Sequence, residues 1–258
     1  MPDNSSVLAP TRQGAGLTEA AGSATSVTDG SFDPLADVTT WPQFFRSVVH
    51  VQPLEDGEEV RVWILDAERE TVSTRVVPRD ASALEDLKDD LLPAVSDPDL
   101  TISFADPLFI GGALSDVYRF LYEADKWPQR VDHVSRIVLT EDTPNVQFFD
   151  MDTRTPDGSS HTTRSVRLCF PEELIVYKQI KLPALLDAHT GHWKFTVTRE
   201  GVVAEARHTA TIKPSALSIL GPGTTVEDAR RYLRRVLSAN SLNSLRCAKA
   251  YAEERAGV

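Results

Sequence analysis

One arginine lies among small polar residues in a segment that alternates like a β-strand. In residues 160–170 (SHTTRSVRLCF), period-two alternation puts Arg167 on one face with Thr163, Ser165 and Cys169. A closed apolar core would not hold these groups, because each unpaired polar atom costs about 1–3 kcal/mol. A guanidinium stays charged at any working pH and presents several donors in one plane, so it can stabilise negative charge that develops in a reaction. We expect this face to line a cavity for a small molecule.

Aromatic and polar side chains recur on the neighbouring segments. Residues 173–181 and 189–199 also read as strands, and their candidate inward-facing groups are Tyr177, Gln179, His189 and Trp193. Trp193 and the earlier Trp127 offer flat indole faces on which a planar ligand could stack. Histidine titrates near neutral pH and can act as a general acid, a role that His133 could fill.

Each of these residues also has a purely structural interpretation. Arg167 could be a surface arginine that pairs with Glu172 or Glu173. The two tryptophans could be anchors of the core, and His133 could be a solvated loop residue. The residue types alone leave these alternatives open.

Composition and spacing exclude several classes of function. His189 and His192 stand three residues apart, which sends them to opposite faces of a strand, and no glycine-rich phosphate loop occurs, so we expect no metal and no cofactor. The 27 Lys and Arg against 38 Asp and Glu give a net charge of −11, which argues against a nucleic-acid partner. Two cysteines exclude a disulfide framework, and no apolar run reaches the ~18 residues that a membrane span needs. We expect a cytoplasmic protein.

The elements that position the candidate residues follow from the hydrophobic pattern. Residues 1–32 show no hydrophobic period and are predicted to be a disordered leader. Trp127-Pro128 is predicted to end a helix, and turns are predicted at 155–158 and 199–201. Helices are predicted at 81–92, 113–127 and 224–255, and strands at 46–54, 59–66, 71–77, 101–110, 132–140, 145–154, 160–170, 173–181, 189–199 and 202–213.

The last helix carries polar residues on its inner stripe. Thr224 and Glu227 form a predicted capping box at its start, and Gly257 is placed to end it. Asn240 and Ser244 interrupt the apolar stripe, which suits a helix that lies over a cavity. The order of elements predicts an α+β fold in which a curved antiparallel sheet grips the long C-terminal helix and leaves an internal cavity.

Two parts of the chain resemble each other. Trp41-Pro42-Gln43 matches Trp127-Pro128-Gln129, 86 residues later, and each is followed by a Val-rich strand. Residues 71–75 (TVSTR) parallel residues 163–167 (TRSVR). The first copy is much shorter and has too few strands to enclose a pocket. The alternative is coincidence over a common tripeptide.

Several long strings resemble one enzyme family. They are WPQRVDHVSRIVLTEDTPNVQFFDMDT, DGSSHTTRSVRLCFPEELIVYKQ, HTGHWKF, RHTATI and ANSLNSLRCAKAYAEE. With these the chain resembles the didomain aromatase/cyclases of bacterial aromatic (type II) polyketide synthases, densely over 100–255 and patchily over 33–92. The resemblance implies a helix-grip fold of the START/Bet v1-like (SRPBCC) superfamily. It also implies a cavity for a poly-β-ketone chain on acyl carrier protein, and dehydration or aldol closure of the first ring.

The resemblance also implies roles for individual residues. The family's catalytic arginine falls on Arg167, 40 residues after Trp127, its pocket aromatics on Trp127 and Trp193, and its pocket serine on Ser165. Single-domain relatives can have a tyrosine where this chain has Val134, so an acid–base role would pass to His133 or Tyr177. Further substrate contacts are expected from Thr163, Gln179, His189 and Asn240. Arg75 holds the equivalent place in the first copy.

These observations predict a truncated helix-grip repeat at 33–95 and a complete aromatase/cyclase domain at 100–258. The expected partners are acyl carrier protein and the minimal polyketide synthase, docking transiently at the basic patch Arg230, Arg231, Arg234 and Arg235. That patch could instead be a solvated helix face balanced by Glu227 and Asp228. Two other functions stay open: a non-catalytic binding module for an aromatic polyketide or another hydrophobic small molecule, and a scaffold that forms a homodimer through 33–95.

Overall fold

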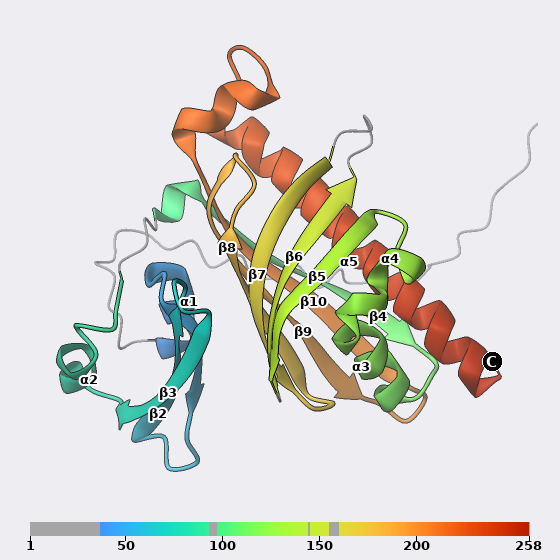
Figure 1. Ribbon diagram of the computed structural model, residues 1–258, viewed down its shortest axis with the longest axis horizontal. Coiled ribbons are helices and arrows are strands. Elements are labelled where there is room, and N and C mark those ends of the chain that lie inside the picture. Colours follow the sequence, from blue (N-terminus) through green and yellow to red (C-terminus); the bar gives the residue numbers. More distant parts are fainter. Residues whose placement is uncertain (1–36, 93–96, 144, 155–159, 258) are drawn as a thin grey trace, which may run out of the picture. The chain divides into compact units, whose positions relative to one another are not determined.

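The computed structural model describes residues 37–92, 97–143, 145–154 and 160–257 (Figure 1). The predicted leader and the predicted turn at 155–158 lie outside these residues. The described residues form a three-stranded sheet in the order β1-β2-β3 and a seven-stranded sheet in the order β4-β10-β9-β8-β7-β6-β5. Every pairing in both sheets is antiparallel.

The seven-stranded sheet and its helices follow the predicted order of elements. The strand bounds agree with the prediction within three residues. Register shifts interrupt the pairing of β5 with β6, of β7 with β8 and of β9 with β10. The elements are β4 (Thr101–Ile110), α3 (Leu114–Tyr122), η3 (Ala124–Lys126), α4 (Trp127–Arg130), β5 (Val134–Thr143), β6 (Val146–Arg154), β7 (Ser160–Phe170), β8 (Leu174–Lys181), β9 (Leu186–Val197), β10 (Val202–Ile212), η4 (Pro214–Leu220) and α5 (Val226–Ala256).

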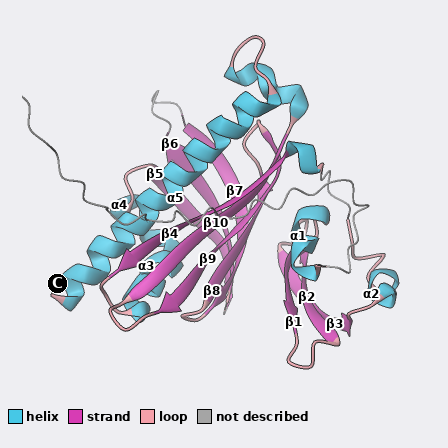
Figure 2. Ribbon diagram, turned by 180° about the vertical axis from the view of Figure 1, so that it is seen from behind, coloured by secondary structure: helices cyan, strands magenta, loops and turns pink. Residues whose placement is uncertain are grey.

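The long helix α5 crosses one face of this sheet (Figures 1 and 2). Its capping box uses Thr225 and Asp228, one residue later than predicted, while the hydroxyl of Thr224 donates to the carbonyl of Gly221. Gly257 ends the helix as predicted, with a left-handed φ of 73° that a glycine adopts without strain. The predicted α+β architecture, a sheet gripping a C-terminal helix, is confirmed.

The inner stripe of α5 differs from the predicted one. Asn240 is only half-buried, and the hydroxyls of Ser241 and Ser244 donate to the helix carbonyls of Ser238 and Asn240. The hydroxyl groups of these serines therefore have hydrogen-bond partners within the helix, and their presence does not require a cavity beneath it. The buried members of the stripe are Ala229, Leu233, Ser241, Ser244, Leu245, Ala248 and Ala252.

Trp127-Pro128 begins a helix, contrary to the prediction that it ends one. Helix α3 already stops at Tyr122, and Trp127 starts α4 with a proline in its first turn, where no backbone N–H is needed. The indole Nε1 of Trp127 donates to the carbonyl of Phe120 at 3.1 Å, which holds α4 against the end of α3.

The three-stranded sheet repeats part of this arrangement. Its elements are η1 (Val38–Thr40), α1 (Trp41–Phe44), β1 (Val48–Pro53), β2 (Glu59–Asp66), β3 (Thr71–Pro78) and α2 (Ala81–Asp86), with η2 (Pro98–Leu100) before β4. Helix α2 ends earlier than the predicted 81–92. The order α1-β1-β2-β3 matches α4-β5-β6-β7, and the similar strings at 71–75 and 163–167 lie on β3 and β7. The internal similarity therefore covers the same local elements in both copies.

Residues of the first copy pack on the outer face of β6, β7 and β8. Val49 and Leu65 form one buried cluster with Phe148, Val166 and Leu168. The Lys178 ammonium, also buried on this face, donates to the backbone carbonyls of Pro42, Phe45 and Val48 at 2.6, 2.9 and 3.0 Å. Strand alternation places its neighbours Tyr177 and Gln179 on the inner face.

Candidate active site

Arg167 lies on the inner face of β7, as the alternation predicts. Its side chain is 0% exposed, so the alternative of a surface pair with Glu172 or Glu173 is wrong. Its guanidinium carbon lies 5.3 Å from the ring centre of Trp127 and 5.2 Å from that of Phe149, within cation–π distance. Thr163, Ser165 and Cys169, which share this face, are buried as well.

The guanidinium is held by neutral oxygens. Its Nε donates to Oε1 of Gln147 at 2.7 Å and its Nη1 to the carbonyl of Leu121 at 2.8 Å, while Nη2 donates to the carbonyl of Tyr122 and to the same Oε1. Leu121 and Tyr122 are the last residues of helix α3, and the backbone carbonyls at the end of a helix accept no hydrogen bond from an N–H of the same helix. Arg167 therefore also ties α3 to the sheet, a structural role that the sequence did not indicate.

A row of aromatic rings continues from Arg167 along the inner face. Trp127 and Trp193 meet edge to face with ring centres 5.7 Å apart, and Trp193 and Tyr177 lie 5.4 Å apart. Both tryptophans belong to the main core, which bears out the anchor interpretation, while their place on a cavity wall stays a prediction. The Nε1 of Trp193 is buried without a hydrogen-bond partner among the described residues.

Gly191 lets the Tyr177 ring lie against β9. A Cβ at this position would overlap the Tyr177 phenol and the carbonyl oxygen of Arg207. Only glycine therefore fits between β8 and β10 at this point.

Tyr177 leads into a buried group that we call the histidine network: Gln179, His189, His208 and Tyr177. The Tyr177 hydroxyl lies 2.8 Å from Nδ1 of His208, and Nε2 of His189 lies 3.1 Å from the same atom. The Nδ1 of His189 lies 3.0 Å from Oε1 of Gln179. Sequence reasoning missed His208; the signal was a polar residue in the row of inward alanines on β10, at 204, 206 and 210.

The hydrogen-bond directions in the histidine network follow from Gln179. Its Oε1 can only accept, so Nδ1 of His189 donates and Nε2 of His189 is left with a lone pair. When Nδ1–H of His208 donates to that lone pair, the Tyr177 hydroxyl accepts from the same N–H, and the lone pair of His208 is on Nε2. When the Tyr177 hydroxyl donates to Nδ1 instead, Nε2 carries the hydrogen. Nε2 is buried and has no hydrogen-bond partner among the described residues, so in the first tautomer it is an unused proton acceptor.

The histidine network is uncharged near neutral pH. Burial lowers the pKa of His208 to about 4, with Asp106 opposing and Arg234 and His192 adding to the shift. Burial and the neighbouring His208 hold the pKa of His189 well below its usual range. Burial also raises the pKa of the Tyr177 phenol. A proton that binds to the histidine network near neutral pH therefore binds to uncharged side chains.

Comparisons with known proteins identify relatives of the chain. No family model matches it. The bifunctional cyclase/dehydratase of the granaticin polyketide synthase of Streptomyces violaceoruber is 44% identical over 160 residues, which are 61% of this chain and 49% of that protein. The actinorhodin counterpart from Streptomyces coelicolor is 44% identical over 168 residues, 60% of this chain and 51% of that protein. The chain thus spans about half the length of the curated relatives it matches.

Solved structures match over more of the chain. The di-domain ARO/CYC StfQ from the steffimycin biosynthetic pathway is 49% identical, with a TM-score of 0.76 over 87% of this chain and 94% of that chain. The chain belongs to the di-domain aromatase/cyclase family. A second di-domain ARO/CYC, BexL from the BE-7585A pathway, is 32% identical with a TM-score of 0.73 over 85% and 93% of the two chains. Zhui aromatase/cyclase, at 17% identity, a TM-score of 0.54 and 60% and 96% of the two chains, shares the helix-grip fold.

Two residues that the family resemblance pointed to form described contacts with α5 residues. His133 stands in the loop before β5, and its Nδ1 lies 3.1 Å from the side-chain amide nitrogen of Asn243 on α5. Burial lowers the pKa of His133, and Asp132 opposes this shift. Asn240 offers only its backbone carbonyl to a described contact, with Ser244. The α5 amide that meets a candidate site residue is therefore that of Asn243.

The remaining predicted site residues of this aromatase/cyclase family member are Ser165 and Thr163 on β7, with Arg75 in the first copy. Ser165 pairs across the sheet with Phe149 on one side and Gln179 on the other. The hydroxyl of Thr163 is buried without a hydrogen-bond partner among the described residues. In the first copy Arg75 is exposed and faces Asp90, so it has no counterpart of the Arg167 surroundings.

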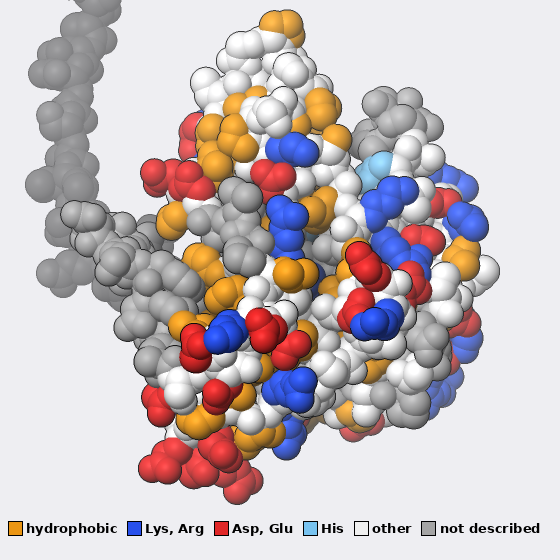
Figure 3. Space-filling view, turned by 60° about the vertical axis from the view of Figure 1, so that its left-hand side comes forward, with side chains coloured by type: hydrophobic (Ala, Val, Ile, Leu, Met, Phe, Trp, Pro, Cys, Tyr) orange, Lys and Arg blue, Asp and Glu red, His pale blue; other side chains and the backbone are white. Residues whose placement is uncertain are grey.

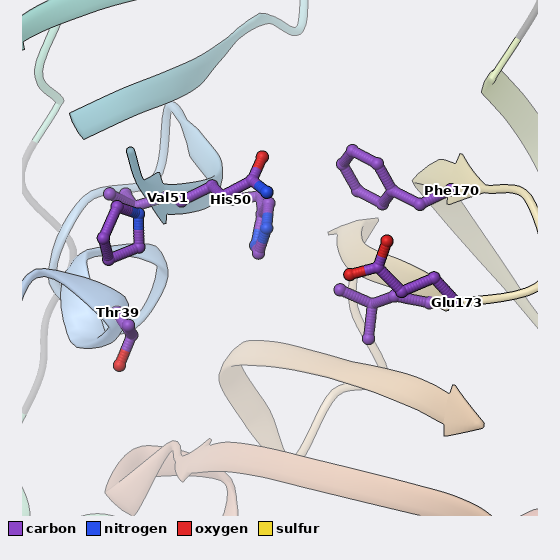
Figure 4. A pocket seen from close by; sticks show the side chains of 8 residues that line it. Thr39, His50, Val51, Phe170 and Glu173 are labelled. Atoms are coloured by element: carbon purple, nitrogen blue, oxygen red, sulfur yellow. The ribbon is translucent and has the colours of Figure 1, made fainter. Parts of the chain in front are cut away.

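One hollow formed by described residues lies away from these residues. It has a volume of about 210 Å³ and lies where β1 faces the β7–β8 turn (Figure 4). Its lining is Thr39, His50, Val51, Gln52, Pro53, Phe170, Glu173 and Leu174. None of the predicted site residues lines it. The cavity that the family resemblance implies under α5 stays a prediction.

The basic patch on α5 is partly neutralised. Arg230 donates to the carbonyls of Thr101 and Asp99, Arg231 pairs with Glu227 and Asp228, and Arg234 forms a bidentate pair with Asp106. Arg235 lies over the Tyr232 ring. Elsewhere on the surface, basic and acidic side chains intermingle on the face in Figure 3.

The described residues contain no cluster of three or more His, Cys, Asp or Glu side chains that could hold a metal ion. None of their helices has the length and apolar character to cross a membrane.

Proposed function

We propose that this chain is an aromatase/cyclase that orients a carrier-protein-bound poly-β-ketone and promotes aldol closure and dehydration of the first ring. Two findings support this: the chain belongs to the di-domain aromatase/cyclase family, and its curated relatives are named polyketide synthase cyclase/dehydratases. The methylenes between the carbonyls of such a substrate are acidic, so the protein has mainly to fold the chain and stabilise charge.

The observation that carries the proposal is a buried guanidinium beside two indoles. Arg167 stays charged away from bulk water, where its interaction with a developing enolate oxygen is stronger than in solution. Trp127 and Trp193 form a continuous aromatic surface next to it, on which a forming ring can stack. In this proposal Ser165 and Thr163 contact substrate oxygens on the same wall.

We assign the proton transfer to His208. Its Nε2 lone pair accepts the proton of a methylene, and the electrons of the broken C–H bond enter the enolate that Arg167 stabilises. The enolate then expels a β-hydroxyl, which takes the proton from Nε2 and leaves as water. Tyr177, Gln179 and His189 fix the orientation of His208. His133 acts through its Nε2, because Asn243 holds Nδ1, and Asn240 contacts substrate from α5.

The domain division and the partners are part of the same proposal. Residues 33–95 are a truncated helix-grip repeat and 100–258 the complete domain, in the cytoplasm. Because the StfQ match covers 87% of this chain, it extends beyond 100–258 into the first repeat. Acyl carrier protein docks transiently at α5, where Arg235 and Arg246 are exposed.

One observation favours a second candidate, a non-catalytic binding module. The guanidinium of Arg167 already donates hydrogen bonds to Leu121, Tyr122 and Gln147, so this arginine would have a structural role even if the protein catalysed no reaction. Such a module would hold an aromatic product against the same tryptophans.

Reconstitution with a minimal polyketide synthase separates the two candidates. We expect the wild type to change the product spectrum, and Arg167→Lys and Arg167→Met to abolish that change while still binding the aromatic product. Arg136→Lys is the matched control, since Arg136 is exposed and pairs with Asp152. A wild type that binds product without changing the spectrum would establish the binding module. An Arg167→Met variant with the wild-type spectrum would remove the arginine from the mechanism.

A further inference from the structure

Gln147 is the cross-strand partner of Arg167. It lies on β6, directly opposite Arg167 in the β6–β7 register, and is 2% exposed. Its neighbour on the same face of β6 is Phe149, which contacts both the guanidinium and Trp127. A buried amide at this place must have its hydrogen-bonding groups satisfied.

The orientation of the Gln147 amide is determined by its surroundings. A guanidinium has only donors, so Oε1 must face it, and Oε1 accepts from both Nε and Nη2 of Arg167. The amide nitrogen of Gln147 then points to the carbonyl of Tyr122 at 3.4 Å, the same carbonyl that accepts from Nη2. Two donors of one edge of the guanidinium thus share a single amide oxygen, which sets the plane of the group.

The chemical type of this acceptor matters for the reaction. A carboxylate in the same place would accept the same two hydrogen bonds and would form a charge-assisted pair with the arginine. It would also oppose the field that a developing enolate oxygen needs from the guanidinium. The Gln147 amide accepts the hydrogen bonds of the Arg167 guanidinium and does not neutralise its positive charge. Glutamate would keep the link from β6 to Arg167 on β7, but it would lose the hydrogen bond from the Gln147 amide nitrogen to the carbonyl of Tyr122 on α3.

We propose that Gln147 is a positioning residue of the aromatase/cyclase reaction: its amide fixes the plane of the Arg167 guanidinium without neutralising it. This inference rests on the proposed function. It assigns to Gln147 a requirement for an uncharged acceptor, which neither its burial nor its place in the sheet alone would impose.

The test compares Gln147→Glu with Gln147→Met, and uses Gln129→Glu on the exposed face of α4 as the matched control for the added charge. Three quantities are measured: the melting temperature, kcat and KM for product formation in the reconstituted synthase, and calorimetric affinity for two probes. The probes are 2-hydroxy-1,4-naphthoquinone as its anion and its neutral methyl ether. The binding arm needs no turnover, so it separates failure of this inference from failure of the proposed function.

Gln147→Glu gains a charge-assisted pair with Arg167 and loses the hydrogen bond to the carbonyl of Tyr122, so we expect it to melt near the wild-type temperature. We expect its kcat to fall by about 10-fold or more and its KM to change little. Affinity for the anion should fall by at least about 10-fold, and affinity for the methyl ether should not change. Gln147→Met should lose kcat and melt earlier, yet keep its preference for the anion. Gln129→Glu should behave as the wild type.

Two outcomes overturn the inference. One is wild-type kcat and anion affinity in Gln147→Glu; the other, decisive if that variant does not fold, is wild-type kcat in Gln147→Met. If the wild type leaves the product spectrum unchanged but Gln147→Glu still selectively loses the anion, the proposed function fails while the role of Gln147 in holding the charge stands.

Discussion

Replacing Lys178 by methionine tests how the first repeat is attached to the larger sheet. The ammonium of Lys178 donates to three backbone carbonyls, those of Pro42, Phe45 and Val48. Methionine has a similar length and no donor. The carbonyl of Phe45 keeps a second donor, the N–H of Val48 at 3.2 Å, so the loss falls mainly on the other two carbonyls.

The magnitude follows from these contacts. At pH 9 the Lys178 amine is neutral in the folded chain, because its pKa there is about 7. A buried carbonyl that loses its hydrogen-bond donor costs about 1–3 kcal/mol. We expect Lys178→Met to lower the free energy of unfolding by about 2–4 kcal/mol at pH 9, equivalent to roughly 5–15 °C in melting temperature for a chain of this size.

The effect should depend on pH in a defined direction. Burial, and next the like charge of Arg46, lower the pKa of Lys178 from 10.5 to about 7. Between these two values the unfolded chain binds a proton that the folded chain does not. The stability of the wild type relative to Lys178→Met therefore increases from pH 7 to pH 10, by up to about 1.4 kcal/mol per unit, and is lost as the pH falls through 7.

Urea unfolding at pH 6.5, 8 and 9.5 measures this difference. Lys181→Met, an exposed change at the end of the same strand, is the control and should shift neither stability nor its pH dependence. If the gap between the wild type and Lys178→Met is constant or narrows as pH rises, the buried ammonium does not titrate as described. If Lys178→Met is as stable as the wild type at all three values, the three carbonyls do not depend on it.

Three further results are expected. The pKa of His208 is lowered to about 4 in the folded chain, so the unfolded chain binds a proton at higher pH than the folded chain does. The free energy of unfolding should therefore fall by about 3 kcal/mol for this group as the pH drops from 6.5 to 4. Urea unfolding midpoints measure this fall, and His208→Gln should make the free energy of unfolding depend less on pH. Gly191→Ala should cost more than about 3 kcal/mol, since its Cβ would overlap the carbonyl of Arg207; normal thermal stability would contradict the packing. Tyr177→Phe removes the 2.8 Å contact with His208 and should cost about 1 kcal/mol in urea unfolding, whereas an unchanged midpoint would mean that the contact contributes nothing.

Local patterns predicted the strands and the inner face of β7 well. Alternation is a property of the strand itself, so the burial of Ser165 and Arg167 could be read from neighbouring residues. The left-handed Gly257 at the end of α5 is another local signal. The capping box slipped by one residue because Thr224 and Thr225 are adjacent and both precede an acidic residue by three.

Contacts between distant segments could not be read in this way. Arg167 bonds carbonyls about 45 residues earlier, and main-chain acceptors leave no mark on residue types. The same holds for the partners of Lys178. His208 belongs to an alanine row that looked like plain packing, and Asn243 lies three positions from the predicted Asn240 because the helix phase was misjudged.

The buried side chains of Lys178 and Arg167 share a property that bears on the evolution of the fold. The hydrogen bonds that Lys178 donates to described residues go to three peptide carbonyls, and Arg167 donates to two peptide carbonyls. Every amino acid supplies such an oxygen, so the side chains around positions 42–48 and 121–122 can drift without breaking either junction. Homologues should therefore keep the two basic residues while the segments they grip diverge, and pairwise covariation would not reveal these links.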